Sequence, residues 1–178
     1  MVDRYSLVPA VHAFVRDYER DEVLLIRRSH TGWLDGFWTV PSGHLEKGES
    51  VLTATARELL EEVNISASES SLRVVGVMHR QGEDAGRVDY FVELEGEWSG
   101  EPENMEPHKA SELRWAKTSD ILGMELIPAV AVALLQPVYP RGGAWSMSLP
   151  DSNQPHVSTN AATHEQPFDD SINLLRRD

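Results

Sequence analysis

The chain has 178 residues, with 16 Lys and Arg against 29 Asp and Glu, so its formal net charge near neutral pH is −13. This length suits one domain with a proper hydrophobic core, and so acidic a balance argues against a nucleic-acid polymer or an anionic membrane as partner. The chain has no cysteine, which excludes disulfides, thiolate catalysis and cysteine-ligated metals. It shows no secretory signal and no apolar stretch long enough to span a bilayer, so we expect a soluble, cytoplasmic protein.

The N-terminal part of the chain alternates between strand and helix patterns. Two runs rich in β-branched residues, 7–15 and 23–26, flank a polar segment and predict a β-hairpin. Residues 37–40 predict a third strand, which ends at Pro41. Residues 50–63 contain no Gly or Pro and place apolar side chains at helical spacing, so they predict a helix.

Further along, residues 72–78, 88–94 and 113–116 predict three more strands, and the second of them alternates apolar and polar side chains. Residues 128–135 predict a closing helix, with Pro128 at its first position. Strands interrupted by one helix and followed by another predict an α/β fold, in which helices sandwich a mixed sheet.

The composition changes after residue 140, where a Ser, Asn, Pro, His and Gln-rich stretch without hydrophobic period begins. We therefore predict a domain at 1–140 and a disordered tail at 141–178. The end of the tail, 168–177, has the pattern of one short amphipathic turn. An alternative to disorder is that the tail docks on a partner or on a second copy of the chain, as in a homodimer.

The helix expected at 50–63 carries a cluster of acidic residues. Glu61 and Glu62 follow Glu58 by three and four positions, so the three side chains project toward the same surface spot. Three like charges destabilise this arrangement unless a cation lies among them, and carboxylate oxygens favour Mg²⁺, with Mn²⁺ as a substitute. A divalent cation would also allow so acidic a protein to bind a phosphorylated small molecule.

The loop before this helix supports a functional interpretation over a merely solvated acidic face. Gly43 and Gly48 let the backbone turn tightly, and Gly43 can offer its carbonyl to a metal. Glu49 lies near the helix start, where the helix dipole favours a carboxylate. Arg57 lies beside Glu58 and is placed to form an ion pair with Glu49.

These residues resemble the signature of Nudix hydrolases, which reads Gly, five residues, Glu, seven residues, Arg-Glu-apolar-x-Glu-Glu-x-Gly-apolar. Its fixed positions are occupied here by Gly43, Glu49, Arg57, Glu58, Leu59, Glu61, Glu62 and Ile65. Asn64 replaces the last glycine, and Asn is the next best residue for the left-handed conformation that often follows a helix. The residues at 27–28 and 36–38 also look like the family.

The resemblance implies a Nudix fold, an α/β/α sandwich around a mixed sheet. It implies a Mg²⁺-dependent pyrophosphohydrolase that cleaves a diphosphate linkage in a small nucleoside diphosphate derivative by metal-activated water. It further implies that Glu58, Glu61 and Glu62 ligate the metal, with the Gly43 carbonyl as a further ligand, and that Arg57 belongs to the catalytic set.

In this family the general base is a signature glutamate or an acid on a later loop. We select Glu106, because residues 104–109 look like a segment of MutT-type members; an exposed loop acid is the alternative. Lys109 is a candidate for contact with a phosphate, and Arg28 is a further candidate for binding substrate. A base could stack on one of several aromatic residues, of which we select Trp38 from the set Trp33, Trp38, Tyr90 and Trp115.

Two substrate markers of the family are missing from residues 66–89, namely the Pro of ADP-ribose-cleaving members and the Tyr of dinucleoside polyphosphate hydrolases. Their absence favours hydrolysis of a nucleoside triphosphate, including a modified one, to monophosphate and pyrophosphate. Alternatives are ADP-ribose, a nucleotide-sugar or another diphosphate as substrate, and a catalytically inactive Nudix binding module. An isopentenyl diphosphate isomerase is set aside, because its catalytic Cys is missing.

Overall fold

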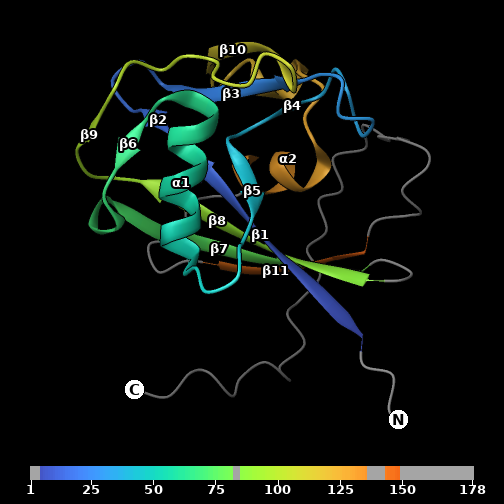
Figure 1. Cartoon of the computed structure of the whole chain (residues 1–178). Coiled ribbons are helices and arrows are strands. Elements are labelled where there is room, and N and C mark those ends of the chain that lie inside the picture. The colour runs from blue at the N-terminus through green and yellow to red at the C-terminus, as the bar shows by residue number, and fades with distance from the viewer. Residues whose placement is uncertain (1–4, 82–84, 136–142, 149–178) are drawn as a thin grey trace.

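The computed structural model describes residues 5–81, 85–135 and 143–148 (Figure 1). The strands in these ranges are β1 (Ser6–Phe14), β2 (Arg16–Asp17), β3 (Glu22–Arg28), β4 (Trp38–Thr39), β5 (Ser42–His44), β6 (Ser66–Ala67), β7 (Leu72–Gln81), β8 (Ala85–Leu94), β9 (Trp98–Ser99), β10 (Ala110–Lys117) and β11 (Gly143–Ser148). The helices are α1 (Val51–Val63), α2 (Pro128–Leu135) and the short 3₁₀ helices η1 (Glu69–Ser71) and η2 (Ile121–Gly123). No helix in the described ranges is both long and apolar enough to cross a membrane.

The largest sheet contains five strands in the order β11-β7-β8-β1-β5. β1 runs parallel to β8 and antiparallel to β5, so the sheet is mixed, as the sequence predicts. Leu59 and Val63 of α1 share a core cluster with Val92, whereas Val130 of α2 shares another with Phe91. Because successive strand residues point to opposite faces, these two neighbours on β8 place α1 on one face of the sheet and α2 on the other.

A second sheet has the order β10-β3-β2, and β4 also pairs with β3. Its strand β3 contributes Leu24 to the core on the α1 side and Leu25 to the core on the α2 side. Figure 1 shows this sheet beside one end of α1. The second sheet thereby closes that end of the sandwich, and the end of β3 reaches the candidate site.

The hairpin expected from residues 7–15 and 23–26 forms only near its turn. β1 and β3 belong to different sheets, and only the two-residue β2 continues the pairing with β3. β1 is buried from Ala10 to Phe14 on both of its faces. Such a strand needs a partner on each side and cover on each face, which one hairpin neighbour cannot supply. The strand expected at 37–40 is shortened to β4.

Helix α1 begins and ends almost where the sequence predicts. The N–H of Thr53 donates to the hydroxyl of Ser50 at 3.0 Å, which caps the start of the helix. Asn64 follows the helix with φ 59° and ψ 30°, the left-handed conformation expected at this signature position. Its side-chain amide also donates to the carbonyl of Glu101 at 3.1 Å, so Asn64 adds a contact that glycine would lack.

The tail predicted at 141–178 contains a strand in its described part. Residues 143–148 form β11, which pairs in parallel with β7. Composition did not reveal it, because Trp145 and Met147 alternate with small residues over only six positions inside a Ser- and Pro-rich stretch. The turn expected at 168–177 lies outside the described residues.

A buried charged group lies within the largest sheet, on β1, β7 and β8. Asp89 accepts a bidentate pair of hydrogen bonds from the guanidinium of Arg80, and Nε2 of His12 lies 3.2 Å from the same carboxylate. All three side chains are buried. Burial raises the pKa of Asp89, but the hydrogen bonds from His12 and Arg80 outweigh it and bring the pKa down to about 2. The carboxylate of Asp89 is therefore ionised at neutral pH, and both of its oxygens have partners in Arg80 and His12.

Replacing Asp89 by Asn should lower the free energy of unfolding at pH 7 by about 3 kcal/mol, because Arg80 is left buried without its carboxylate. The pKa of Asp89, about 2 when folded, lies below its ordinary value of 3.8. Its stabilising contribution is therefore complete above about pH 4 and is lost as the pH falls towards 2. Urea unfolding should show that the difference in unfolding free energy between wild type and variant becomes smaller as the pH falls from about 4 towards 2. A difference that does not change with pH would contradict this assignment to Asp89. Asp120→Asn, at an exposed position, is the control.

Candidate active site

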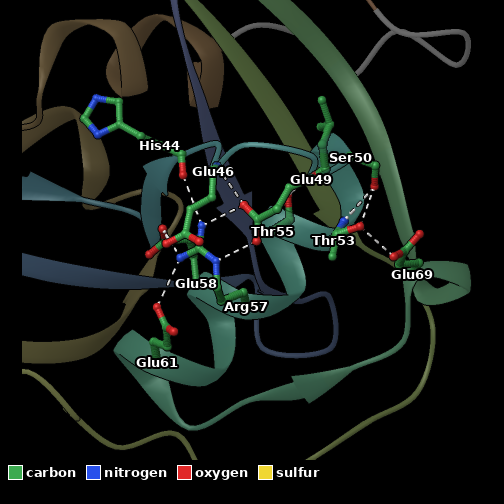
Figure 2. A network of polar contacts seen from close by, with 11 residues as sticks. His44, Glu46, Glu49, Ser50, Thr53, Thr55, Arg57, Glu58, Glu61 and Glu69 are labelled. Carbon is green, nitrogen blue, oxygen red and sulfur yellow. Dashed lines mark hydrogen bonds and ion pairs between the residues drawn. The ribbon is translucent and has the colours of Figure 1, made fainter.

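The guanidinium of Arg57 links the loop before α1 to the carboxylates on the helix (Figure 2). It donates to both carboxylate oxygens of Glu49, at 2.8 and 3.0 Å, and to the carbonyl of His44 at 3.1 Å. It also donates to Glu58 at 2.7 Å and to Glu61 at 3.1 Å. Hydrogen bonds from Arg57 bring the pKa of Glu49 down to about 2. The ion pair that the sequence predicts between Arg57 and Glu49 is confirmed.

Gly43 lies directly against the carboxylate of Glu58. A Cβ added at Gly43 would come within 1.8 Å of Oε1 of Glu58, so only glycine permits this contact between β5 and α1. Burial raises the pKa of Glu58, while the bond from Arg57 opposes the shift. The first glycine of the signature therefore gives the helix carboxylate access to the backbone of β5.

Glu62, one helical turn after Glu58, lies in a small pocket. Its carboxylate accepts a hydrogen bond from the N–H of Ser42 at 2.8 Å. Burial raises the pKa of Glu62 to about 8, and the nearby charges of Glu58 and Glu106 add to the shift. The pocket has a volume of about 50 Å³, enough for an ion with water but too small for a nucleoside. It is lined by Ile26, Arg28, Thr31, Thr39, Ser42, Glu62, Asn104, Glu106, Lys109 and Ala110.

The loop between β9 and β10 brings Glu106 and Lys109 to this pocket. The N–H of Met105 donates to the carbonyl of Glu62 at 3.1 Å, which docks the loop on the end of α1. The side chain of Asn104 accepts from the N–H of Glu106, also at 3.1 Å. Lys109 donates to the Glu106 carboxylate at 2.7 Å, and this bond raises the pKa of Lys109. The loop therefore brings the carboxylate of Glu106 and the ammonium group of Lys109 to the pocket that also contains Glu62.

Of the two other sequence-selected binding residues, Arg28 lines the pocket and Trp38 does not. Arg28 donates to the hydroxyl of Thr31 at 2.8 Å and to the carbonyl of Trp33 at 3.0 Å, and its guanidinium lies 5.2 Å from the centre of the Trp33 ring. Trp38 is only 7% exposed and belongs to the core beside α2. Its burial favours a packing role, whereas Trp33 is 39% exposed next to Arg28.

Sequence reasoning did not select Ser42 or Asn104. Ser42 contributes through its backbone N–H, which any residue but proline could supply, so its identity carried no signal. Asn104 acts by orienting the loop rather than by its own chemistry. Its place inside the segment 104–109 was the available clue.

The predicted metal ligands do not converge on one point in the structure. Glu58 and Glu61 bond to Arg57, and Glu62 bonds to Ser42. Within the described ranges, no group of three His, Asp or Glu side chains is arranged to hold a metal ion. The donor set nonetheless fits a hard divalent cation, because, in addition to burial, the nearby charge of Glu106 raises the pKa of Glu58 and of Glu62, and the charge of Glu58 raises that of Glu62 further. Metal binding here stays a prediction.

Comparison with known proteins identifies the family of this chain. A family model described as the NUDIX domain matches residues 6–135. YvcI of Bacillus subtilis, named an uncharacterized Nudix hydrolase, is 27% identical over 110 residues, which make up 61% of this chain. The match spans 66% of the length of YvcI.

Solved structures share the fold. The MutT Nudix hydrolase from Burkholderia pseudomallei has a TM-score of 0.64 and 25% identity, over 74% of this chain and 98% of that chain. The Nudix domain of Shewanella oneidensis NrtR, solved in complex with ADP-ribose, has a TM-score of 0.58 and 18% identity, over 75% and 86% of the two chains. These likenesses confirm the fold, and the match of the NUDIX domain model confirms the family that the signature predicts.

Replacing Gly43 by Ala should displace Glu58, because the new methyl group would overlap its carboxylate. Because moving this carboxylate breaks its hydrogen bond from Arg57, we expect the free energy of unfolding to fall by about 1 to 3 kcal/mol. The matched control is Gly123→Ala, where an added Cβ meets no atom within 4 Å. Its unfolding energy should stay within about 0.5 kcal/mol of wild type. Equal urea-unfolding midpoints for both variants would show that the contact between Gly43 and Glu58 is not tight.

Proposed function

This chain belongs to the Nudix hydrolase family, and we propose that it is a Mg²⁺-dependent pyrophosphohydrolase that converts a nucleoside triphosphate to monophosphate and pyrophosphate. The observation that carries the proposal is the pocket in which the carboxylates of Glu62 and Glu106 lie beside the cationic side chains of Arg28 and Lys109. Carboxylates suit a divalent cation, and guanidinium and ammonium groups suit phosphate oxygens. A pocket with both sets suits a metal-bound phosphate chain.

We assign the metal-holding role to Glu58, Glu61 and Glu62, with the carbonyl of Gly43 as a further ligand. A bound Mg²⁺ would neutralise the diphosphate oxygens and lower the pKa of a water molecule for in-line attack. Arg57 acts as a positioning residue, because it already fixes Glu58 and Glu61. In the reaction the water oxygen bonds to one phosphorus while the bridging P–O bond breaks, and pyrophosphate leaves.

We assign the role of proton acceptor to Glu106. Its carboxylate is bonded to Lys109 in the free protein. A substrate phosphate would compete for that ammonium group and leave the carboxylate free to accept the proton of the attacking water. On this proposal, one movement of Lys109 both binds the phosphate and releases the base.

The nucleoside has to lie outside the pocket, because about 50 Å³ cannot contain it. Trp33 offers an exposed ring next to Arg28, so a base stacked there would remain connected to phosphates held by the arginine. The fold likeness to a MutT Nudix hydrolase agrees with a hydrolytic function. The cytoplasmic location and the homodimer expected from the sequence remain predictions.

ADP-ribose is the second candidate substrate. The specific observation in its favour is the Nudix domain of NrtR, which has the same fold and binds this ligand. Both substrates contain a diphosphate next to a nucleoside, so the pocket chemistry suits either of them. The products distinguish them, since ADP-ribose would give AMP and ribose phosphate.

The test is product analysis with Mg²⁺ and a panel of nucleoside triphosphates (oxidised ones included), ADP-ribose, dinucleoside polyphosphates and nucleotide-sugars. We expect one triphosphate to give monophosphate and pyrophosphate by chromatography. Glu62→Gln should lower kcat by about 10² or more with an unchanged circular dichroism spectrum, because the change removes a metal-holding carboxylate oxygen and keeps the size of the side chain. Glu97→Gln, at an exposed acid outside the pocket, should retain wild-type activity. Turnover of no compound, or full activity of Glu62→Gln, would contradict the proposal.

A further inference from the structure

A second group of polar side chains lies on the face of the large sheet opposite α1. His44 on β5, Ala10 on β1 and Asp89 on β8 are in register, and Arg87 on β8 is two residues from Asp89. Residues in register, and residues two apart on a strand, point to the same face. Phe91 continues this row into the core beside α2. The group therefore lies on the α2 side of the sheet.

Arg87 has no carboxylate partner in this group. Its neighbour Asp89 is already bonded to Arg80 and His12. Arg87 is half-buried, yet it makes no hydrogen bond or ion pair with any residue in the described ranges. Burial lowers its pKa, and the charge of Arg80 lowers it further. A guanidinium has five N–H donors, so this one is ready to bind an anion from outside the protein.

The group adjoins the candidate active site at β5, the last strand of the large sheet. The backbone carbonyl of His44 accepts from Arg57, while Figure 2 shows its imidazole directed away from the α1 carboxylates. Arg28 lines the carboxylate pocket, and its pKa is lowered by burial, raised by the charge of Glu62 and lowered by that of Arg87. Arg28 therefore lies near enough to the carboxylate of Glu62 and to the guanidinium of Arg87 for both charges to act on it.

A buried polar atom on the same face also lacks a partner. Nδ1 of His12 has no hydrogen-bond partner in the described part of the chain, although the side chain is only 8% exposed. His12 follows Ala10 by two positions on β1, so it shares the face of Asp89 and Arg87. A polar group supplied from outside the protein would satisfy this atom.

We propose that Arg87, together with Arg28 and His44, forms a phosphate-binding subsite for a phosphate group beyond those held in the carboxylate pocket. The proposal rests on the proposed function and favours its triphosphate substrate over ADP-ribose, because the subsite needs a chain of three or more phosphates. The small pocket accepts a cation and the adjoining phosphate oxygens, so a longer chain has to extend beyond it. Arginine suits this role, because its planar fork matches phosphate oxygens and stays charged when half-buried.

The test is isothermal titration of the full chain with inorganic tripolyphosphate and with pyrophosphate, each in the presence of Mg²⁺. Arg87→Gln should raise the Kd of tripolyphosphate about tenfold or more, since a charge-assisted contact is lost, and change the Kd of pyrophosphate less than twofold. Arg87→Lys, which keeps the charge without the fork, should give an intermediate Kd. Phosphorus NMR after each titration checks that the probe is intact.

The matched control is Arg73→Gln, on β7, where the arginine pairs with Glu95 at the surface. It should leave both Kd values unchanged. Equal weakening of both probes by Arg87→Gln, or no weakening of either, would overturn the subsite. Should Arg87→Gln not fold, wild-type selectivity in Arg87→Lys would overturn it as well.

This test is independent of turnover. If no triphosphate is hydrolysed but the loss of tripolyphosphate binding in Arg87→Gln persists, the proposed function fails and the subsite stands. If a triphosphate is hydrolysed and Arg87→Gln binds both probes as wild type does, the function stands and the subsite fails.

Discussion

The candidate site depends on the repulsion between carboxylates that one helix turn brings together, and on the single guanidinium that offsets it. Arg57 binds Glu49 with two hydrogen bonds and also reaches Glu58 and Glu61. Because Glu49 precedes α1, the same guanidinium fixes the loop to the helix. This link in turn holds β5 against α1, where Gly43 leaves room for the Glu58 carboxylate. Removing the guanidinium would therefore disturb charge balance and geometry together.

The separation of charge around β5 explains how a protein with a net charge of −13 can be suited to a polyanion. On the α1 side, Arg57 takes up much of the negative charge, and Glu62 is left in a pocket that disfavours its ionisation. On the α2 side, Asp89 balances one of two nearby arginines and leaves Arg87 available. The carboxylate pocket with Arg28 and Lys109 thus lies on one side of this short strand, and Arg87 lies on the other.

The features that the sequence predicted correctly are those set by residues close together in the chain. The helix, its carboxylates, the link between Arg57 and Glu49 and the left-handed Asn64 all depend on residues within a few positions of one another. The hairpin prediction is correct only near the turn, because strand pairing depends on distant partners, here β8 and β5 for β1. Trp38 was selected as one of several aromatic residues on which a base could stack, but the pairing of β4 with β3 places it in the core. The spacing of residues along the chain does not show which strands pair or in what register.

Arg87 was not selected from the sequence, because it belongs to no motif. Its proposed role depends on the pairing of β7 with β8. Arg80 and Arg87 lie opposite each other on β7 and β8, and the single carboxylate of Asp89 is bonded to Arg80. A half-buried guanidinium without a partner is unfavourable in the free protein, since it is desolvated without compensation. A bound phosphate removes that penalty, so part of the affinity for an extended phosphate chain would come from satisfying a charge that the fold leaves unpaired.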